Sequence, residues 1–284
     1  MTGRITITEL LKAKQERRPI AAVSCYDYTT ARLVAESNVE MVLVGDSAAQ
    51  MMLGFDSTLP ATMDFMVAIT AAVRRAAPNL YLVADMPFLS YHLGLGAAIS
   101  NAGRFLTDAG AQMVKIEATE TYLDTVKAVS SAGIPVMAHI GILPQRIAAV
   151  GRFRAEATTA EAAITLVDLA ERMIAAGAGA LLIEGTAAEV AQTVTARCEV
   201  PVISCGSGPG CDGQILIAPD ILGLSAGHPP KFAKAYADLG PQSVDAFQKY
   251  AEDVRAGRFP DAEHSYHMKR GELERFQALL QKGP

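Results

Sequence analysis

The length, composition and charge of this chain exclude several classes of protein. It has 284 residues, of which 50% are hydrophobic and 19% charged, with a formal net charge of −5 and an isoelectric point near 5.6. A chain of this size can bury a large core, and its acidic balance argues against nucleic acid or an anionic membrane as a partner. We therefore expect a globular protein whose partners are neither nucleic acids nor membranes.

Apolar segments of four to six residues alternate with helical patterns along the chain. Short, β-branched runs flanked by helical patterns are typical of buried parallel strands. We expect strands at residues 20–25, 41–46, 81–85, 113–117, 135–139, 180–184, 201–205 and 214–217. We expect helices at residues 8–17, 28–36, 62–76, 97–109, 121–132, 159–176, 187–197, 243–255 and 269–281. Thr62 and Thr159 are predicted to cap two of these helices, each with an acid in the first turn.

This order of elements predicts an α/β fold. Eight strands with intervening helices favour a (β/α)8 TIM barrel with extra helices at the ends of the chain, and a doubly wound open sheet is the alternative. No linker rich in Pro, Gly or Ser divides the sequence, so residues 1–284 are expected to form a single barrel domain.

Compartment and redox state follow from the N-terminus and the cysteines. Residues 1–6 lack the apolar core of a signal peptide, and the apolar run at residues 174–183 is too short to span a membrane. The four cysteines show no C-x-x-C spacing, which argues against a zinc knuckle or a disulfide framework. We expect reduced thiols and a cytoplasmic protein.

Five of the predicted strands end in a titratable side chain. These side chains are Asp46, Asp85, Glu117, His139 and Glu184. The carboxyl ends of all strands in a barrel converge on one mouth, and catalytic residues of such barrels lie there. The repetition therefore predicts an enzyme with its active site at this mouth.

Two of these acids suggest a metal site. Asp46 and Asp85 end neighbouring strands, so both carboxylates can face one ion. Oxygen ligands without a cysteine–histidine set favour a hard cation, most simply Mg²⁺ with water and substrate completing its shell. The alternative is that each aspartate caps the helix that follows it.

The other polar residues at the strand ends each allow two interpretations. Lys115 projects to the same side of its strand as Glu117, so it either pairs with that acid or holds an anionic substrate. His139 is either structural or functional. Glu184 ends an apolar strand, a setting that suits a general base. Ser47 either binds a substrate carboxylate or caps a helix.

The chain resembles the ketopantoate hydroxymethyltransferase family over nearly its whole length. The resemblance is carried by the blocks LVGDS (43–47), DSTLP (56–60), TAAVRR (70–75), ADMPF (84–88), MVKIE (113–117), HIGILPQ (139–145), DGQIL (212–216) and GHPPKFAK (227–234). It implies a barrel of the phosphoenolpyruvate-mutase/isocitrate-lyase type that assembles as a homo-oligomer, a decamer of stacked pentamers. The implied activity is Mg²⁺-dependent transfer of a hydroxymethyl group from 5,10-methylenetetrahydrofolate to 3-methyl-2-oxobutanoate, giving 2-dehydropantoate for pantothenate biosynthesis.

The resemblance also implies roles for individual residues. Asp46 and Asp85 would ligate Mg²⁺ and Glu117 would support it, while Glu184 would remove a proton from C3 of the 2-oxo acid. The substrate-binding residues implied are Ser47, Asp85, Lys115 and His139.

Two other functions remain open from the sequence. The loops at residues 48–50, 151–157 and 204–208 depart from the family pattern, and Arg152, Arg154 and the glycine-rich loop 206–210 are candidate anion contacts. They motivate an Mg²⁺-dependent lyase, aldolase or mutase on a different 2-oxo acid. A non-catalytic homologue is the third hypothesis, and the retention of all the charged strand-end residues argues against it.

Overall fold

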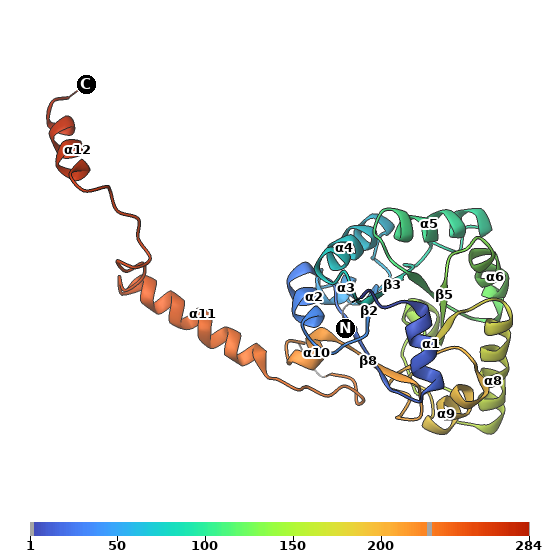
Figure 1. Ribbon diagram of the computed structural model, residues 1–284. Helices are drawn as coiled ribbons and strands as arrows, with labels where there is room; N and C mark the ends of the chain where they lie inside the picture. Colours follow the sequence, from blue (N-terminus) through green and yellow to red (C-terminus); the bar gives the residue numbers. More distant parts are fainter. Residues whose placement is uncertain (1–2, 226–228, 284) are drawn as a thin grey trace. The chain divides into compact units, whose positions relative to one another are not determined.

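Eight parallel strands close on themselves in chain order, as the computed structural model shows over residues 3–225 and 229–283 (Figure 1). The strands are β1 Ile20–Ser24, β2 Met41–Val44, β3 Tyr81–Asp85, β4 Met113–Glu117, β5 Val136–Gly141, β6 Ala180–Glu184, β7 Val202–Cys205 and β8 Gly213–Ile217. β1 pairs with both β2 and β8, so the sheet has no edge. The predicted (β/α)8 barrel is confirmed, and the open-sheet alternative was wrong.

The strands form because they are short apolar runs, most of whose residues are covered on both faces. Every residue of β2, β3 and β4 is buried, which explains why these strands read as continuous hydrophobic segments rather than alternating ones. The largest fully buried side chains include Tyr81, Phe105, Met113 and Met137. Burying a side chain of this size contributes roughly 1.5–3 kcal/mol, so the barrel core is a main source of stability.

Helices surround the barrel and cover its ends. They are α1 Ile7–Gln15, α2 Tyr28–Ala35, α3 Ala48–Met51, α4 Met63–Ala76, α5 Leu95–Thr107, α6 Leu123–Ser131, α7 Ile147–Val150, α8 Ala160–Ala175, α9 Ala188–Arg197 and α10 Ala218–Leu222, with 3-10 turns η1 Glu120–Tyr122 and η2 Pro144–Arg146. The predicted caps are confirmed, because Thr62 accepts a hydrogen bond from Phe65 N and Thr159 accepts one from Ala162 N, each at 3.3 Å.

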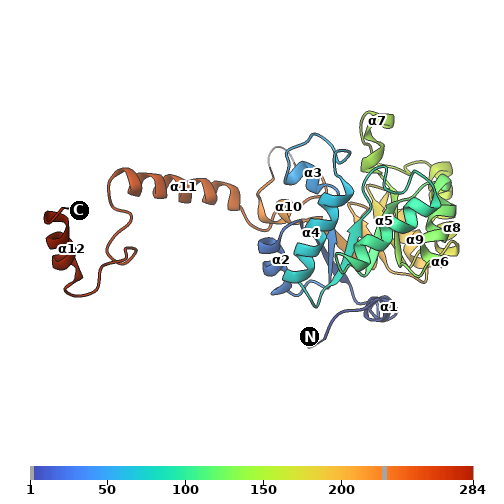
Figure 2. The same cartoon turned by 90° about the horizontal axis from the view of Figure 1, so that it is seen from above.

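Three short helices were not predicted. α3, α7 and α10 have four or five residues, which is too few for a helical period to be read from sequence. Figure 2 shows α3 and α7 at one end of the barrel and α1 at the other. α3 follows β2 and α7 follows β5, so the end that carries them is the mouth formed by the carboxyl ends of the strands.

The chain divides into two compact units, Met1–Tyr236 with the complete barrel and Ala237–Pro284. The second unit contains α11 Leu239–Arg255 and α12 Glu272–Gln281, neither of which has a buried residue, and both were predicted as terminal helices. The single domain expected over residues 1–284 stays a prediction. Residues 227 and 228 of the recognised block 227–234 lie outside the described residues.

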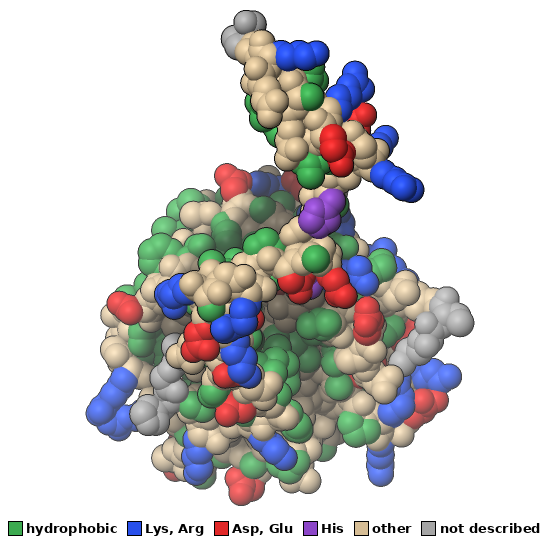
Figure 3. Space-filling view, turned by 90° about the vertical axis from the view of Figure 1, so that its left-hand side faces the viewer, with side chains coloured by type: hydrophobic (Ala, Val, Ile, Leu, Met, Phe, Trp, Pro, Cys, Tyr) green, Lys and Arg blue, Asp and Glu red, His purple; other side chains and the backbone are tan. Residues whose placement is uncertain are grey.

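The distribution of charged side chains and the lengths of the helices bear on whether a membrane or a polyanion is a partner. On the face drawn in Figure 3, basic and acidic side chains are interspersed, and neither sign forms a continuous patch there. None of the helices that the structure describes is both long enough and apolar enough to cross a bilayer.

Candidate active site

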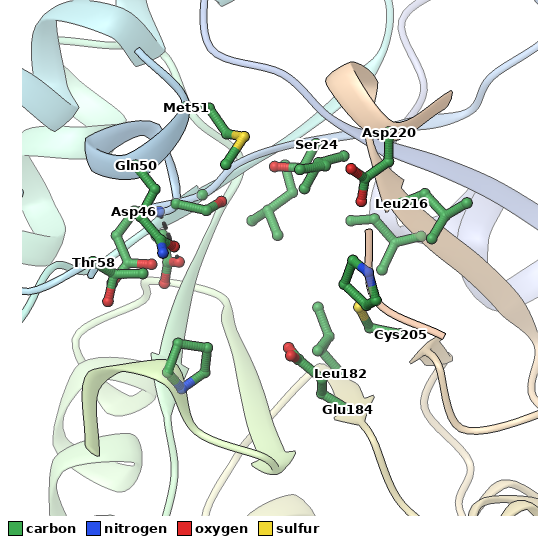
Figure 4. Close-up of a pocket in the computed structure, with 18 of the residues that line it drawn as sticks. Ser24, Asp46, Gln50, Met51, Thr58, Leu182, Glu184, Cys205, Leu216 and Asp220 are labelled. Carbon is green, nitrogen blue, oxygen red and sulfur yellow. Dashed lines mark hydrogen bonds between the residues drawn. The ribbon is translucent and has the colours of Figure 1, made fainter. Parts of the chain in front are cut away.

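A cavity of about 380 Å³ opens at the carboxyl ends of the strands, where the predicted site residues meet (Figure 4). Its polar lining includes Asp46, Ser47, Asp85, Lys115, His139 and Glu184. In Figure 4, Asp46 and Glu184 lie on different sides of the cavity. Glu117 does not line it, so six of the seven predicted residues face one space and the seventh is buried behind it.

Asp46 and Asp85 form the most acidic part of this wall. The backbone N–H of Asp46 donates to Asp85 Oδ2 at 3.1 Å, and both side chains are buried. Burial, together with the negative charge of Asp85, raises the pKa of Asp46 well above its usual range. Neither residue occupies a helix N-cap position, because Ser47 is the N-cap residue of α3 and Gly94 that of α5, so the capping alternative was wrong.

Lys115 is held by Asp85 rather than by Glu117. Its Nζ lies 2.8 Å from Asp85 Oδ1 and 3.2 Å from His139 Nδ1, and all three side chains are buried. Asp85 and Lys115 are register partners on β3 and β4, which places their side chains together. Burial alone would lower the pKa of Lys115, but the surrounding carboxylates outweigh it and raise that pKa, so the ammonium stays charged.

His139 links this pair to Glu184. His139 Nε2 lies 3.2 Å from Glu184 Oε2, and the side chain of His139 is 2% exposed while that of Glu184 is 20% exposed. Burial and the charge of Lys115 lower the pKa of His139 despite the nearby Glu184 carboxylate. A neutral imidazole facing an ammonium at Nδ1 carries its proton on Nε2, which places that proton on the side of Glu184. The two groups lie within contact distance but are not aligned as a hydrogen bond in this structure.

Gln145 connects the acids, and sequence reasoning missed its role. Its backbone N–H lies 3.1 Å from both carboxylate oxygens of Glu117, and its Nε2 donates to Asp46 Oδ2 at 2.8 Å and to Met86 O at 2.9 Å. Tyr91 donates its hydroxyl to Gln145 Oε1 at 2.7 Å. The only sequence signal was its place at the end of the HIGILPQ block, since an amide in a loop has no distinctive spacing.

Contacts of Ser47 and of the glycine-rich loop bear on the alternatives left open for them. Ser47 Oγ lies 2.8 Å from the hydroxyl of Tyr26 and makes no side-chain cap bond to α3, although Ser47 is its N-cap residue. Gly206 has φ +70°, and a Cβ there would overlap the ring of Phe232. Close packing against Phe232 and the positive φ therefore explain this glycine without a phosphate ligand.

The charge balance of the site suits a divalent cation. Three carboxyl groups, those of Asp46, Asp85 and Glu117, are buried near the Lys115 ammonium. Carboxylate oxygens are the ligands that Mg²⁺ prefers, usually one or two from the protein with water and substrate completing the shell. No group of three or more His, Cys, Asp and Glu side chains poised around one ion occurs within the described ranges. The fit is therefore to an ion held by the two cavity aspartates together with its substrate.

Comparison with known proteins places the chain in a family. A sequence model described as "Ketopantoate hydroxymethyltransferase" matches residues 4–262. The chain belongs to the ketopantoate hydroxymethyltransferase family. It is 46% identical over 282 residues to a 3-methyl-2-oxobutanoate hydroxymethyltransferase of Hyperthermus butylicus, covering 99% of this chain and 97% of that protein. It is 45% identical over 267 residues to the protein of that name from Pelobacter propionicus, covering 94% and 99% of the two chains.

Solved structures support the fold assignment of this ketopantoate hydroxymethyltransferase family member. A 2,3-dimethylmalate lyase, described as a PEP mutase/isocitrate lyase superfamily member, matches with a TM-score of 0.60 and 18% identity, covering 99% of this chain and 98% of that one. An oxaloacetate acetylhydrolase matches with a TM-score of 0.60 and 14% identity, covering 97% and 95%. The expected barrel type is confirmed, and at these identities the likeness concerns the fold alone.

Proposed function

We propose that this chain is a 3-methyl-2-oxobutanoate hydroxymethyltransferase, which transfers a one-carbon unit from 5,10-methylenetetrahydrofolate to 3-methyl-2-oxobutanoate and yields 2-dehydropantoate. Family membership and full-length relatives of this name support the activity. The observation that carries the chemistry is the continuous series of contacts from Glu184 through His139 and Lys115 to Asp85 along one wall of the cavity.

The reaction needs a base at C3 of the 2-oxo acid. The C3–H bond breaks, its proton passes to Glu184, and C3 forms a bond to the one-carbon unit of the folate. The two C–N bonds that hold this carbon to the folate break, and a water oxygen becomes the hydroxyl of the product. The proton from Glu184 and one proton from that water pass to the two folate nitrogens, so tetrahydrofolate leaves and Glu184 is again a carboxylate. Glu184 is the partly exposed carboxylate at the cavity, and His139 Nε2 lies 3.2 Å from one of its oxygens, so the other oxygen is available to accept the proton.

The remaining polar residues are proposed to bind and orient the 2-oxo acid. The Lys115 ammonium offsets the negative charge of the substrate, and Ser47 is available to donate a hydrogen bond to the substrate carboxylate. Apolar side chains in the same lining, including Leu43, Leu182 and Ile215, form a surface that suits the two methyl groups at C3.

Asp46 and Asp85 are the residues proposed to hold Mg²⁺, and Glu117 supports them from behind through Gln145. When bound, such an ion supplies Lewis-acid polarisation of the 2-oxo group, which makes the C3 proton more acidic. Gln145 keeps the Asp46 carboxylate aimed at the cavity, and Lys115 does the same for Asp85.

The alternative reaction on a different 2-oxo acid keeps one of its three motivating features, because Arg152 lines the cavity next to the reaction cavity. The other two features give it no support. Arg154 lines neither the reaction cavity nor the cavity next to it, and the turn at Gly206 is filled by Phe232. Folate-independent aldol cleavage by the purified enzyme would revive that alternative. The homo-oligomer, a decamer by resemblance, stays a prediction that analytical ultracentrifugation tests.

Exchange of the C3 proton of 3-methyl-2-oxobutanoate in D₂O, followed by NMR with Mg²⁺ and without folate, tests the proposed base. We expect exchange with the wild type and a loss of about 10²–10⁴-fold in Glu184→Gln, the usual contribution of a general base. Glu189→Gln, the same change on the exposed side of α9, is the control and should exchange normally. Undiminished exchange in Glu184→Gln would assign the base to another residue. No exchange by the Mg²⁺-loaded wild type would assign the enzyme to a different acid.

A further inference from the structure

A second cavity of about 490 Å³ lies beside the reaction cavity at the same end of the barrel. It is enclosed by the segments that follow β4 and β5, by the loop after α7, and by α8. Phe153 lines both cavities, and Leu143 of the second is followed in the chain by Pro144 of the first. The two spaces are therefore neighbours that share one aromatic wall.

The second cavity carries unpaired positive charge. Arg146 and Arg152 line it, and within residues 3–225 and 229–283 neither guanidinium forms an ion pair or a side-chain hydrogen bond. Glu156 is the one acid in the lining, so two arginines against one glutamate leave a net charge of +1. Guanidinium groups without a partner at the rim of a cavity suit carboxylate or phosphate, which they bind in a fork-like geometry.

The wall between the cavities is anchored next to the proposed base. The backbone N–H of Glu156 donates to Gly185 O at 2.9 Å, and Ala187 N donates back to Glu156 O at 3.2 Å. Gly185 directly follows Glu184, so the loop that carries Arg152 and Phe153 is held to the end of β6. A ligand that occupies the second cavity is thereby placed within reach of the reacting carbon.

The reaction cavity is too small to hold both the 2-oxo acid and a whole tetrahydrofolate, so the second cavity is available for the rest of the folate. The reaction cavity, at about 380 Å³, is of the size that small ligands fill, and the 2-oxo acid already takes part of it. A tetrahydrofolate adds a fused ring, an aminobenzoyl ring and a glutamate with two carboxylates, and only its one-carbon unit has to reach C3. The rest of that molecule needs an adjoining space with apolar walls and an anion site, and Leu166, Val150 and the two arginines provide both.

We propose that the second cavity binds the aminobenzoyl-glutamate part of the folate co-substrate, with Arg146 and Arg152 pairing with its carboxylates and Phe153 packing against the ring system. This inference rests on the proposed function for the identity of the co-substrate. It assigns Arg146 and Arg152, which take no part in the proton transfer, to the selection of the one-carbon donor.

Binding of tetrahydrofolate, measured by titration calorimetry, tests the subsite without requiring turnover. We expect Kd to rise about tenfold or more in Arg146→Gln and in Arg152→Gln, because each variant loses a charge-assisted hydrogen bond. Arg154→Gln removes the same charge from the same loop but from outside the cavity lining, so its Kd should stay close to that of the wild type. C3 proton exchange without folate should be unchanged in both cavity variants.

Three results would overturn the subsite: equal losses in Arg154→Gln and Arg152→Gln, an unchanged Kd in both cavity variants, or no binding of tetrahydrofolate by the wild type. The first would mean that only the general charge of the loop matters. Formation of 2-dehydropantoate by the wild type is measured separately and tests the proposed function. If the arginine variants weaken tetrahydrofolate binding but the wild type forms no 2-dehydropantoate, the subsite is retained and the proposed reaction is rejected. If the wild type forms 2-dehydropantoate but the arginine variants bind tetrahydrofolate normally, the reaction is retained and the subsite is rejected.

Discussion

The side-chain amide of Gln145 donates a 2.8 Å hydrogen bond to Asp46 Oδ2, although 99 residues separate the two in the chain. The same residue meets Glu117 through its backbone N–H, so one loop residue orients two buried carboxylates that come from different strands. A buried carboxylate in this position keeps its direction only while such a donor is present, because little water is available to replace it.

Replacing Gln145 should therefore impair the site without touching the substrate. We expect Gln145→Leu to lower Mg²⁺ affinity and kcat/KM by about 10–100-fold, the usual cost of losing an outer partner of a metal ligand. Mg²⁺ titration by calorimetry and steady-state kinetics measure the two effects. Tyr91→Phe, which removes only the hydroxyl that binds Gln145 Oε1, is the control and should cost less. Equal losses in both variants would show that packing matters here rather than the contact with Asp46.

Lys115 should matter for stability as well as for binding. Lys115→Met leaves the Asp85 carboxylate buried without its partner, and we expect a loss of about 3–5 kcal/mol in the free energy of unfolding. Adding Asp85→Asn removes the stranded charge and should restore much of that loss. Urea denaturation of the wild type, both single variants and the double variant forms the cycle that measures the coupling. If the double variant is as unstable as Lys115→Met, the loss does not come from an unpaired Asp85.

The turn at Gly206 gives a test of packing. Gly206→Ala places a Cβ into the ring of Phe232 at a backbone φ of +70°, so we expect destabilisation of about 1–3 kcal/mol. The control is Gly103→Ala in the middle of α5, where no atom lies within 4 Å of the new Cβ, and this change should stabilise by about 0.5–1 kcal/mol. Thermal unfolding of both variants measures the difference. A neutral Gly206→Ala would show that the loop can move aside.

His92 should make stability depend on pH. It packs among Phe88, Tyr91 and Tyr122, and its burial lowers its pKa below the ordinary value of 6.5. Between the folded pKa and 6.5 the unfolded chain binds more protons than the folded one, so stability falls as the pH drops through this window. In His92→Phe this contribution disappears, and the difference in unfolding free energy between pH 8 and pH 5 should become smaller. An unchanged difference in urea denaturation would mean that His92 titrates alike in both states.

Much of this protein was determined by local sequence. The eight strands and the main helices follow from short apolar runs, helical periods and caps such as Thr62, which act over a few residues and so can be read in order along the chain. The placement of Asp85 and Glu184 at strand ends follows from the same pattern, because parallel strands of a barrel all present their carboxyl ends at one mouth. Two predicted strand ends were wrong by two residues, because β2 ends at Val44, before Asp46, and β5 continues past His139 to Gly141, although both side chains still line the mouth.

Other features were decided only by the tertiary structure. Lys115 has Glu117 two residues away in sequence, but pairs with Asp85 because the register of β3 and β4 sets those two side by side. The connection after β5 folds back over the strand ends, and this places the Gln145 amide against Asp46. The same connection places Arg152, but not Arg154, in the lining of the second cavity. Such contacts join residues far apart in the chain, and their distances depend on how strands and loops pack, for which a single sequence carries no local signal.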